Sequence, residues 1–174
     1  MKSQKIDAGA IFPPFSAVSV EEGTTLDIGA ASGKWQLVVV YRGKHCPRCK
    51  KYLNTLEQMQ SEWVDAGLDI MVVSADSREK AEADVAEFGW TFPVACELPE
   101  SEMRKLGLYI SDPINESEAD GRFAEPAVFC IRPDGGLQIV SISNSPAARP
   151  DLAELLSGMV FNIKNDRPVR GMVI

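Results

Sequence analysis

The sequence has few cysteines, a single histidine, a deficit of positive charge and no long hydrophobic run. Its 174 residues include four cysteines and 18 basic against 25 acidic residues, which gives a formal net charge of −7. A chain with this charge is a poor partner for nucleic acid or an anionic membrane surface, so we expect neither as a partner. No segment approaches the roughly 18 apolar residues of a membrane span, and the N-terminus lacks the apolar run of a signal peptide. We therefore expect a cytoplasmic protein, in a compartment where structural disulfides are uncommon.

The small number of cysteines also limits the kinds of site that the chain can build. A structural zinc site needs about four ligands, but the sequence has one Cys-x-x-Cys pair, no second pair and no His-x-x-x-His. A secreted disulfide framework would place more cysteines in a shorter chain. We therefore expect no metal and no other cofactor.

The motif that is present is "YRGKHCPRCKKYL", residues 41–53, with Cys46 and Cys49 three positions apart. The preceding run "WQLVVVYR" (35–42) is β-branched and aromatic, which is typical of a strand buried on both faces. Apolar residues then recur at helical spacing, with Pro47 in the first turn. The pattern predicts a strand, a Cys-x-x-Cys turn and a helix that ends at Gly67.

This arrangement favours thiol redox chemistry. A cysteine at a helix N-terminus lies where unpaired N–H groups and the helix dipole favour an anion, and such sites lower a thiol pKa from about 8.5 to about 3.5–7.5. Cys49 would share a helix face with Cys46 and could resolve a mixed disulfide. A structural disulfide would close a tiny loop and stabilise little, and nearby positive charge argues against two inert buried thiols. The basic residues around the pair are Arg42, Lys44, Arg48, Lys50 and Lys51.

The other two cysteines and the histidine have simpler interpretations. Cys96 and Cys130 fall inside apolar strands, where a free cysteine behaves as a small hydrophobic residue, and we expect them in the core. His45, beside the pair, is interpreted either as an acid/base group or as a local charge.

Strands and helices alternate along the rest of the chain, which predicts one α/β domain over residues 1–174. We expect one or two short strands before residue 36, a strand at 68–75, and a helix opened by an Asp76/Glu79 capping box and ended by Gly89. A strand at 92–97 and a short helix between Pro99 and Gly107 should follow, and then a surface loop at 111–125. The last elements are a hairpin of "PAVFCIR" and "LQIVSIS" joined by "PDGG" and a helix around 152–163.

The strand–Cys-x-x-Cys–helix unit, together with "GWTFPVACELPESEMRKLGLYIS" and "PAVFCIRPDGGLQIV", resembles the thioredoxin superfamily. More closely, the chain resembles the peroxiredoxin-like branch, the alkyl hydroperoxide reductase/thiol-specific antioxidant (AhpC/TSA) group, over roughly residues 10–163. The resemblance implies a thioredoxin-like α/β fold, with a central mixed sheet flanked by helices. It also implies thiol redox chemistry at the first long helix and the formation of homodimers.

Individual residues match two different patterns within this superfamily. The peroxiredoxin motif Pro-x-x-x-Thr-x-x-Cys, placed on "RGKHCPRC", puts the peroxide-attacking cysteine at Cys49, the threonine at Cys46 and the proline at Arg42. A further peroxiredoxin arginine is replaced by Pro126, which resembles the cis-proline of thioredoxins. Arg122 lies nearby in the sequence and could substitute for that arginine.

The leading hypothesis is a thiol–disulfide oxidoreductase with Cys46 as an exposed nucleophile and Cys49 as the resolving thiol. The alternative is a thiol peroxidase in which Cys49 attacks a hydroperoxide and Cys46 resolves it. A third hypothesis is a redox-sensing binding module without turnover. The expected partners are a thiol reductant, a disulfide-bearing protein or a hydroperoxide. The predicted supporting residues are Lys44, His45, Pro47, Arg48, Pro126 and Arg122.

Overall fold

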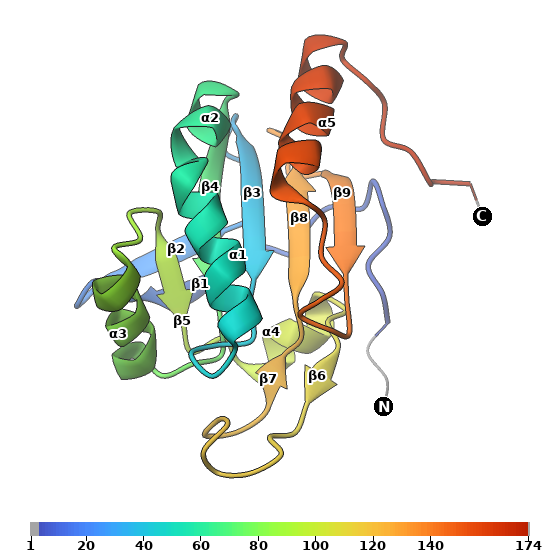
Figure 1. Cartoon of the computed structure of the whole chain (residues 1–174). Helices are drawn as coiled ribbons and strands as arrows, with labels where there is room; N and C mark the ends of the chain where they lie inside the picture. Colours follow the sequence, from blue (N-terminus) through green and yellow to red (C-terminus); the bar gives the residue numbers. More distant parts are fainter. Residues whose placement is uncertain (1–3, 174) are drawn as a thin grey trace.

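A mixed β-sheet of seven strands forms the centre of the computed structural model, which describes residues 4–173 (Figure 1). Its strand order is β2-β1-β5-β4-β3-β8-β9. Strands β3, β4 and β5 are parallel neighbours, whereas the β1–β2, β1–β5, β3–β8 and β8–β9 pairs are antiparallel. The strands are β1 (Phe15–Ser19), β2 (Thr25–Ile28), β3 (Trp35–Val40), β4 (Leu68–Val73), β5 (Val94–Cys96), β8 (Ala127–Ile131) and β9 (Leu137–Ile142).

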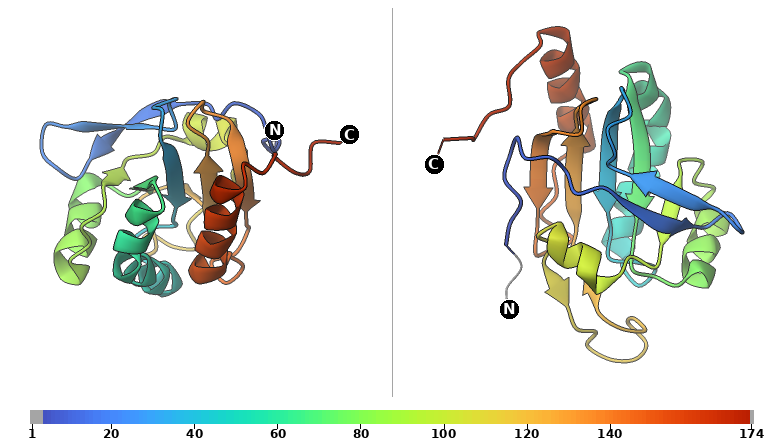
Figure 2. Two further views of the ribbon diagram at one scale, coloured as in Figure 1. Left: turned by 90° about the horizontal axis from the view of Figure 1, so that it is seen from above. Right: turned by 180° about the vertical axis from the view of Figure 1, so that it is seen from behind.

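Helices cover both faces of the sheet (Figure 2). Two separate hydrophobic clusters lie beneath them. Because successive strand residues point to opposite faces, Leu37 packs in the cluster that contains residues of α1 and α5, whereas Val38 packs in the cluster that contains Met103 of α4. The helices are α1 (Pro47–Gln58), α2 (Gln60–Asp65), α3 (Arg78–Phe88), α4 (Glu100–Lys105) and α5 (Leu152–Lys164). The predicted α/β fold with a mixed sheet between helices is confirmed.

Three local predictions were wrong. The expected single helix before Gly67 is divided at Met59, where φ −98° and ψ 2° leave helical geometry and separate α1 from α2. The expected surface loop at 111–125 includes part of a small antiparallel sheet of β6 (Ile110–Ser111) and β7 (Phe123–Ala124). Finally, α3 is capped by Ser77 rather than Asp76, because the Ser77 hydroxyl oxygen accepts the Lys80 N–H at 3.3 Å.

The connection from β3 to α1 places the Cys-x-x-Cys pair at the carboxyl ends of the parallel strands. Strand β3 ends at Val40 and α1 begins at Pro47, while the segment after β4 passes beside this connection (Figure 1). The Tyr41 N–H donates to the Val73 carbonyl and so fixes the start of the turn against β4. Ligand sites of open α/β sheets form at this edge, and side chains from several elements meet here.

Candidate active site

The turn that carries the cysteines, residues 41–46, is fastened to the end of β4. The Lys44 N–H donates to a carboxylate oxygen of Asp76 at 2.7 Å. Gly43 allows this close approach: its φ is +129°, and a Cβ atom there would lie 2.5 Å from Asp76 Oδ1. Asp76, which the sequence suggested as a helix cap, therefore holds the redox turn in place.

Cys46 is the N-cap residue of α1, and this position directs its sulfur at the helix N-terminus. Its backbone is extended, and its Sγ accepts the Cys49 N–H at 3.3 Å. Pro47 occupies the first turn, as predicted, where its missing N–H would have had no partner within the helix. The sequence thus builds a thiolate acceptor at the positive end of the helix dipole.

The two thiols have opposite pKa shifts. The pKa of Cys46 is lowered to about 6, chiefly by a hydrogen bond from the Cys49 thiol, against the opposing effect of burial. The Cys49 N–H, together with hydrogen bonding and positive charge from Arg42, lowers it further. The pKa of Cys49 is raised, because its thiol donates to Cys46 and because it is buried, although the charge of Arg149 opposes the change. These opposite shifts favour Cys46 as the thiolate and Cys49 as the thiol.

Both sulfurs are buried, which corrects the expectation that Cys46 is an exposed nucleophile. The residues are 1% and 0% exposed, and they belong to the hydrophobic cluster that also contains Cys130. The expectation relied on the neighbouring charges staying in water. In the structure three of the five, Arg42, Lys44 and Lys50, bind carboxylates, while Arg48 and Lys51 are exposed on α1 without drawing the cysteines to the surface.

The basic residues on either side of the pair are held by acidic residues from other elements. Lys44 Nζ lies 3.3 Å and Lys50 Nζ 3.6 Å from the same oxygen of Asp84, a fully buried carboxylate on α3. The Arg42 guanidinium lies 3.1 Å from Glu125 and 3.5 Å from Glu118. These pairs weaken the effect of the basic cluster on the thiols, and of its members only Arg42 is among the main causes of the low Cys46 pKa.

His45 contributes no positive charge at neutral pH. Burial, followed by the nearby Arg42 charge, lowers its pKa. Its ring lies 4.7 Å from the ring of Phe123, centre to centre, in an edge-to-face arrangement. Neither ring nitrogen has a hydrogen-bond partner among the described residues. A neutral imidazole in this place packs beside the turn, and the nearby positive charge that acts on Cys46 is that of Arg42.

Two residues that the sequence assigned to the site behave differently. Pro126 is buried immediately before β8, but its peptide bond is trans, as are all others in the described residues, so it does not reproduce the thioredoxin cis-proline. Arg122 is half-exposed, and its guanidinium binds Asp112 at 2.8 Å and Glu100 at 3.3 Å. These ion pairs occupy its guanidinium, and its replacement of the peroxiredoxin arginine stays a prediction.

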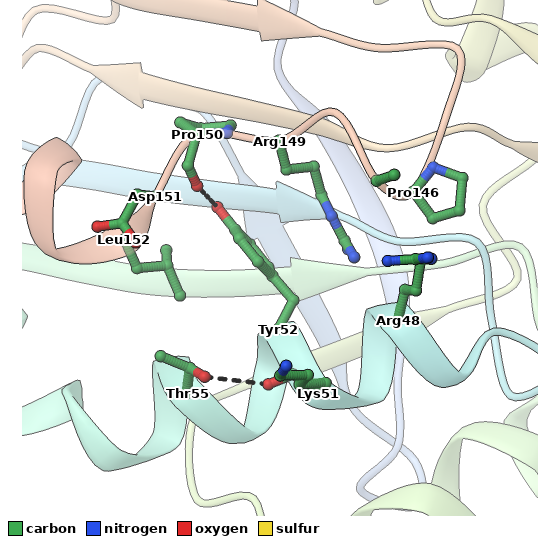
Figure 3. Close-up of a pocket in the computed structure, with 10 residues that line it drawn as sticks. Arg48, Lys51, Tyr52, Thr55, Pro146, Arg149, Pro150, Asp151 and Leu152 are labelled. Carbon is green, nitrogen blue, oxygen red and sulfur yellow. Dashed lines mark hydrogen bonds between the residues drawn. The ribbon is translucent and has the colours of Figure 1, made fainter.

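Arg48 lies on the outer side of α1 and lines a pocket of about 300 Å³ between α1 and the segment before α5 (Figure 3). Lys51 and Tyr52 of α1 and Arg149 also line this pocket. The basic residues of the pocket, Arg48, Lys51 and Arg149, take no part in the ion pairs of Lys44 and Lys50 with Asp84. The structure thus divides the basic residues of the motif between internal ion pairs and an open pocket.

Several residues that shape the site could not be recognised from the sequence. Asp76, Asp84 and Arg149 lie 27 to 100 positions after Cys49, and only the three-dimensional fold brings them to the motif. Asp84 carried no local signal, because its burial on α3 is visible only in the structure. Arg42 was included only as one charge among five, without its contact to Cys46.

The remaining expectations concern groups outside this pair. Cys96 and Cys130 are buried, and burial raises their pKa values to about 11 and about 12, which confirms core packing. Within residues 4–173, no three His, Cys, Asp or Glu side chains are grouped as metal ligands, and no helix is long and apolar enough to cross a membrane.

A Cys-x-x-Cys pair at the N-terminus of a helix, at the edge of a mixed sheet, is typical of thiol oxidoreductases of the thioredoxin-like class. The family model of the AhpC/TSA family matches residues 8–140. The chain belongs to this family and is a peroxiredoxin-like, thiol-dependent oxidoreductase.

Solved structures of peroxiredoxins have the same fold. A peroxiredoxin-like protein from Aquifex aeolicus matches with a TM-score of 0.76 at 18% identity, over 91% of this chain and 88% of that one. Mycobacterium tuberculosis AhpC matches with a TM-score of 0.74 at 19% identity, over 94% and 96%. A mutant of peroxiredoxin 6 of Arenicola marina matches with a TM-score of 0.73 at 20% identity, over 91% and 74%. No curated protein sequence matches the chain significantly.

Proposed function

We propose that this protein is a thiol–disulfide oxidoreductase in which Cys46 attacks the substrate and Cys49 resolves the intermediate. The observation that carries the proposal is the asymmetry of the pair. The Cys46 sulfur accepts the Cys49 N–H at 3.3 Å at the start of α1, and its pKa is lowered to about 6 while that of Cys49 is raised. The thiolate is the reactive species, so Cys46 is suited to attack the substrate and the protonated Cys49 is suited to resolve the mixed disulfide afterwards.

The reaction follows from this assignment in two exchange steps. The Cys46 thiolate attacks one sulfur of the substrate disulfide, forms a mixed disulfide and expels the other sulfur as a thiolate, which takes up a proton. Cys49 then loses its proton and attacks Cys46, which forms the Cys46–Cys49 disulfide and releases the second substrate thiol. The protein dithiol supplies the two electrons, and a thiol reductant must restore it.

The loss of the peroxiredoxin pattern supports disulfide exchange over peroxide reduction. Peroxide cleavage needs groups that orient both oxygens and stabilise the departing oxyanion. Cys46 stands at the place of the family's threonine and Pro126 at the place of an arginine, while Arg122 binds Asp112 and Glu100. Disulfide exchange needs only a thiolate, a resolving thiol and access for the substrate.

Hydroperoxide reduction is the second candidate, and two observations favour it. The solved structures with this fold include several peroxiredoxins. In addition, both sulfurs are buried, which suits a small oxidant. In this candidate Cys49 attacks the hydroperoxide, which gives a sulfenic acid on Cys49 and releases an alcohol or water. Cys46 then attacks the sulfenic acid, and water leaves as the disulfide forms. The raised pKa of Cys49 opposes that order.

Stopped-flow kinetics of the fully reduced protein distinguish the two candidates. We expect the second-order rate constant with a small model disulfide to exceed that of the same disulfide with a free cysteine at pH 7 by roughly a few-fold, because the larger thiolate fraction outweighs the lower nucleophilicity of a thiolate with a low pKa. The reaction with hydrogen peroxide should be the slower one. A rate constant with peroxide much larger than that with the disulfide, together with a sulfenic acid located on Cys49 by mass spectrometry, would contradict the proposed disulfide exchange and support the peroxidase.

A further inference from the structure

The pocket beside α1 concentrates positive charge in a protein that is negative overall. Arg48 and Lys51 reach it from α1 and Arg149 reaches it from the segment before α5, as Figure 3 shows. No carboxylate of the described residues lies within ion-pair distance of any of these three side chains. Like charges gathered in one concave place repel one another, so the pocket is electrostatically suited to an anion.

Arg149 gives this pocket a second, independent sign of a missing partner. Its guanidinium carbon lies 4.3 Å from the centre of the Tyr52 ring, which fixes its position. Its Nε and one Nη atom are buried and have no hydrogen-bond acceptor among the described residues. Buried donors are paired in almost all native structures, so such a group calls for an explanation. A bound carboxylate would accept these N–H groups in the geometry that arginine prefers.

The acidic and polar groups around the pocket are already occupied. Asp151 accepts the N–H groups of Ala153 and Glu154, at 3.0 Å each, and so caps α5. The Tyr52 hydroxyl donates to the Pro150 carbonyl at 2.8 Å. Neither group neutralises Arg149, and the pocket remains open on its basic side.

The pocket is linked to the redox pair by both sequence and electrostatics. Arg48 directly precedes Cys49, and Tyr52 lies one helical turn beyond it on α1. The positive charge of Arg149 also acts on the Cys49 thiol. A ligand bound in the pocket would therefore contact α1 residues on either side of the resolving cysteine. Because both sulfurs are buried, a small molecule suits this site better than a folded protein.

We propose that the pocket of Arg48, Lys51 and Arg149 binds a carboxylate group of the substrate, and that the substrate is a small, carboxylate-bearing disulfide. This inference rests on the proposed disulfide exchange and names its substrate class. The volume of about 300 Å³ is at the lower limit of small-molecule sites, roughly 300–1,000 Å³. The carboxylate would pair with Arg149 and Arg48 while the disulfide faces the cysteines.

The test compares three disulfides that differ in charge: 3,3′-dithiodipropionate, bis(2-hydroxyethyl) disulfide and cystamine. We expect kcat/KM to be highest for the dianionic compound. The ratio to follow is kcat/KM for 3,3′-dithiodipropionate divided by kcat/KM for bis(2-hydroxyethyl) disulfide. In Arg149→Gln this ratio should fall about tenfold, which corresponds to the loss of one charge-assisted hydrogen bond. The matched control is Arg170→Gln, which removes an equal charge from an exposed position and should leave the ratio unchanged.

A ratio that stays the same in Arg149→Gln overturns the proposal. Calorimetric titration of suberate, a non-reactive dicarboxylate of similar length, separates this failure from failure of the proposed function. Suberate binding that weakens in Arg149→Gln supports the pocket even if no disulfide reacts. Equal binding of inorganic phosphate, combined with no preference among the disulfides, would make the pocket a general anion site and contradict the substrate assignment.

Discussion

Replacement of Cys46 by serine should lower the rate of disulfide reduction at least about 10³-fold, because a hydroxyl is not ionised at neutral pH and cannot act as the nucleophile. Cys46 is the sulfur that accepts the Cys49 N–H and carries the lowered pKa. The serine variant keeps an oxygen acceptor at the N-cap, so α1 should still form. The measurement is the single-turnover rate of the reduced protein with a model disulfide.

Cys96→Ser is the matched control for this substitution. Cys96 is buried on β5 and its thiol donates to the Val18 carbonyl at 3.5 Å, a bond that serine can also make. Its pKa is raised, and it has no role in the proposed steps. We expect nearly full activity in this variant. If Cys46→Ser still reduced disulfides at a comparable rate, the attacking sulfur would have to be another cysteine.

Replacement of Cys49 by serine should stop turnover at a different stage. The Cys46 thiolate can still attack, but no second thiol is present to displace the substrate, so a mixed disulfide accumulates on Cys46. We expect multiple-turnover activity to fall at least about 10²-fold while intact-mass spectrometry detects one substrate half bound per chain. Serine retains a hydroxyl donor toward Cys46, so the thiolate keeps part of its stabilisation.

A comparison with Cys49→Ala tests the role of that hydrogen bond. Alanine removes the donor that contributes most to the low pKa of Cys46, so the attack should be slower at pH 6 than in the serine variant. An adduct on Cys46 in both variants agrees with the proposed roles. Absence of any adduct in Cys49→Ser, together with an intact Cys46, would contradict the assignment of Cys49 as the resolving thiol.

The sequence predicted those parts of the site that depend on local patterns. The buried run of β3, Pro47 in the first turn of α1 and the spacing of Cys46 and Cys49 all follow from short-range rules, and the structure agrees with each. The hairpin of β8 and β9 was similarly marked by its turn residues. Alternation of strands and helices was sufficient for the mixed α/β sheet.

The sequence could not predict the environment of the cysteines, because that environment comes from distant segments. The basic residues around the motif suggested exposed thiols, yet Asp84 on α3 binds both Lys44 and Lys50. Asp76 had the spacing of a helix cap, but the fold directs its carboxylate to the Lys44 N–H. Arg149 lies 100 positions after Cys49 and reaches it only through the packing of the segment before α5.

The central claim is that Cys46, and not Cys49, carries the reactive thiolate. Alkylation of the reduced protein with limiting iodoacetamide at a series of pH values, followed by peptide mass spectrometry, tests it most directly. As pH rises through about 6, Cys46 loses its proton, so its labelling rate should rise and then level off, while Cys49 stays largely unlabelled. Preferential labelling of Cys49, or a Cys46 rate that still increases near the ordinary thiol pKa of about 8.5, would contradict the account.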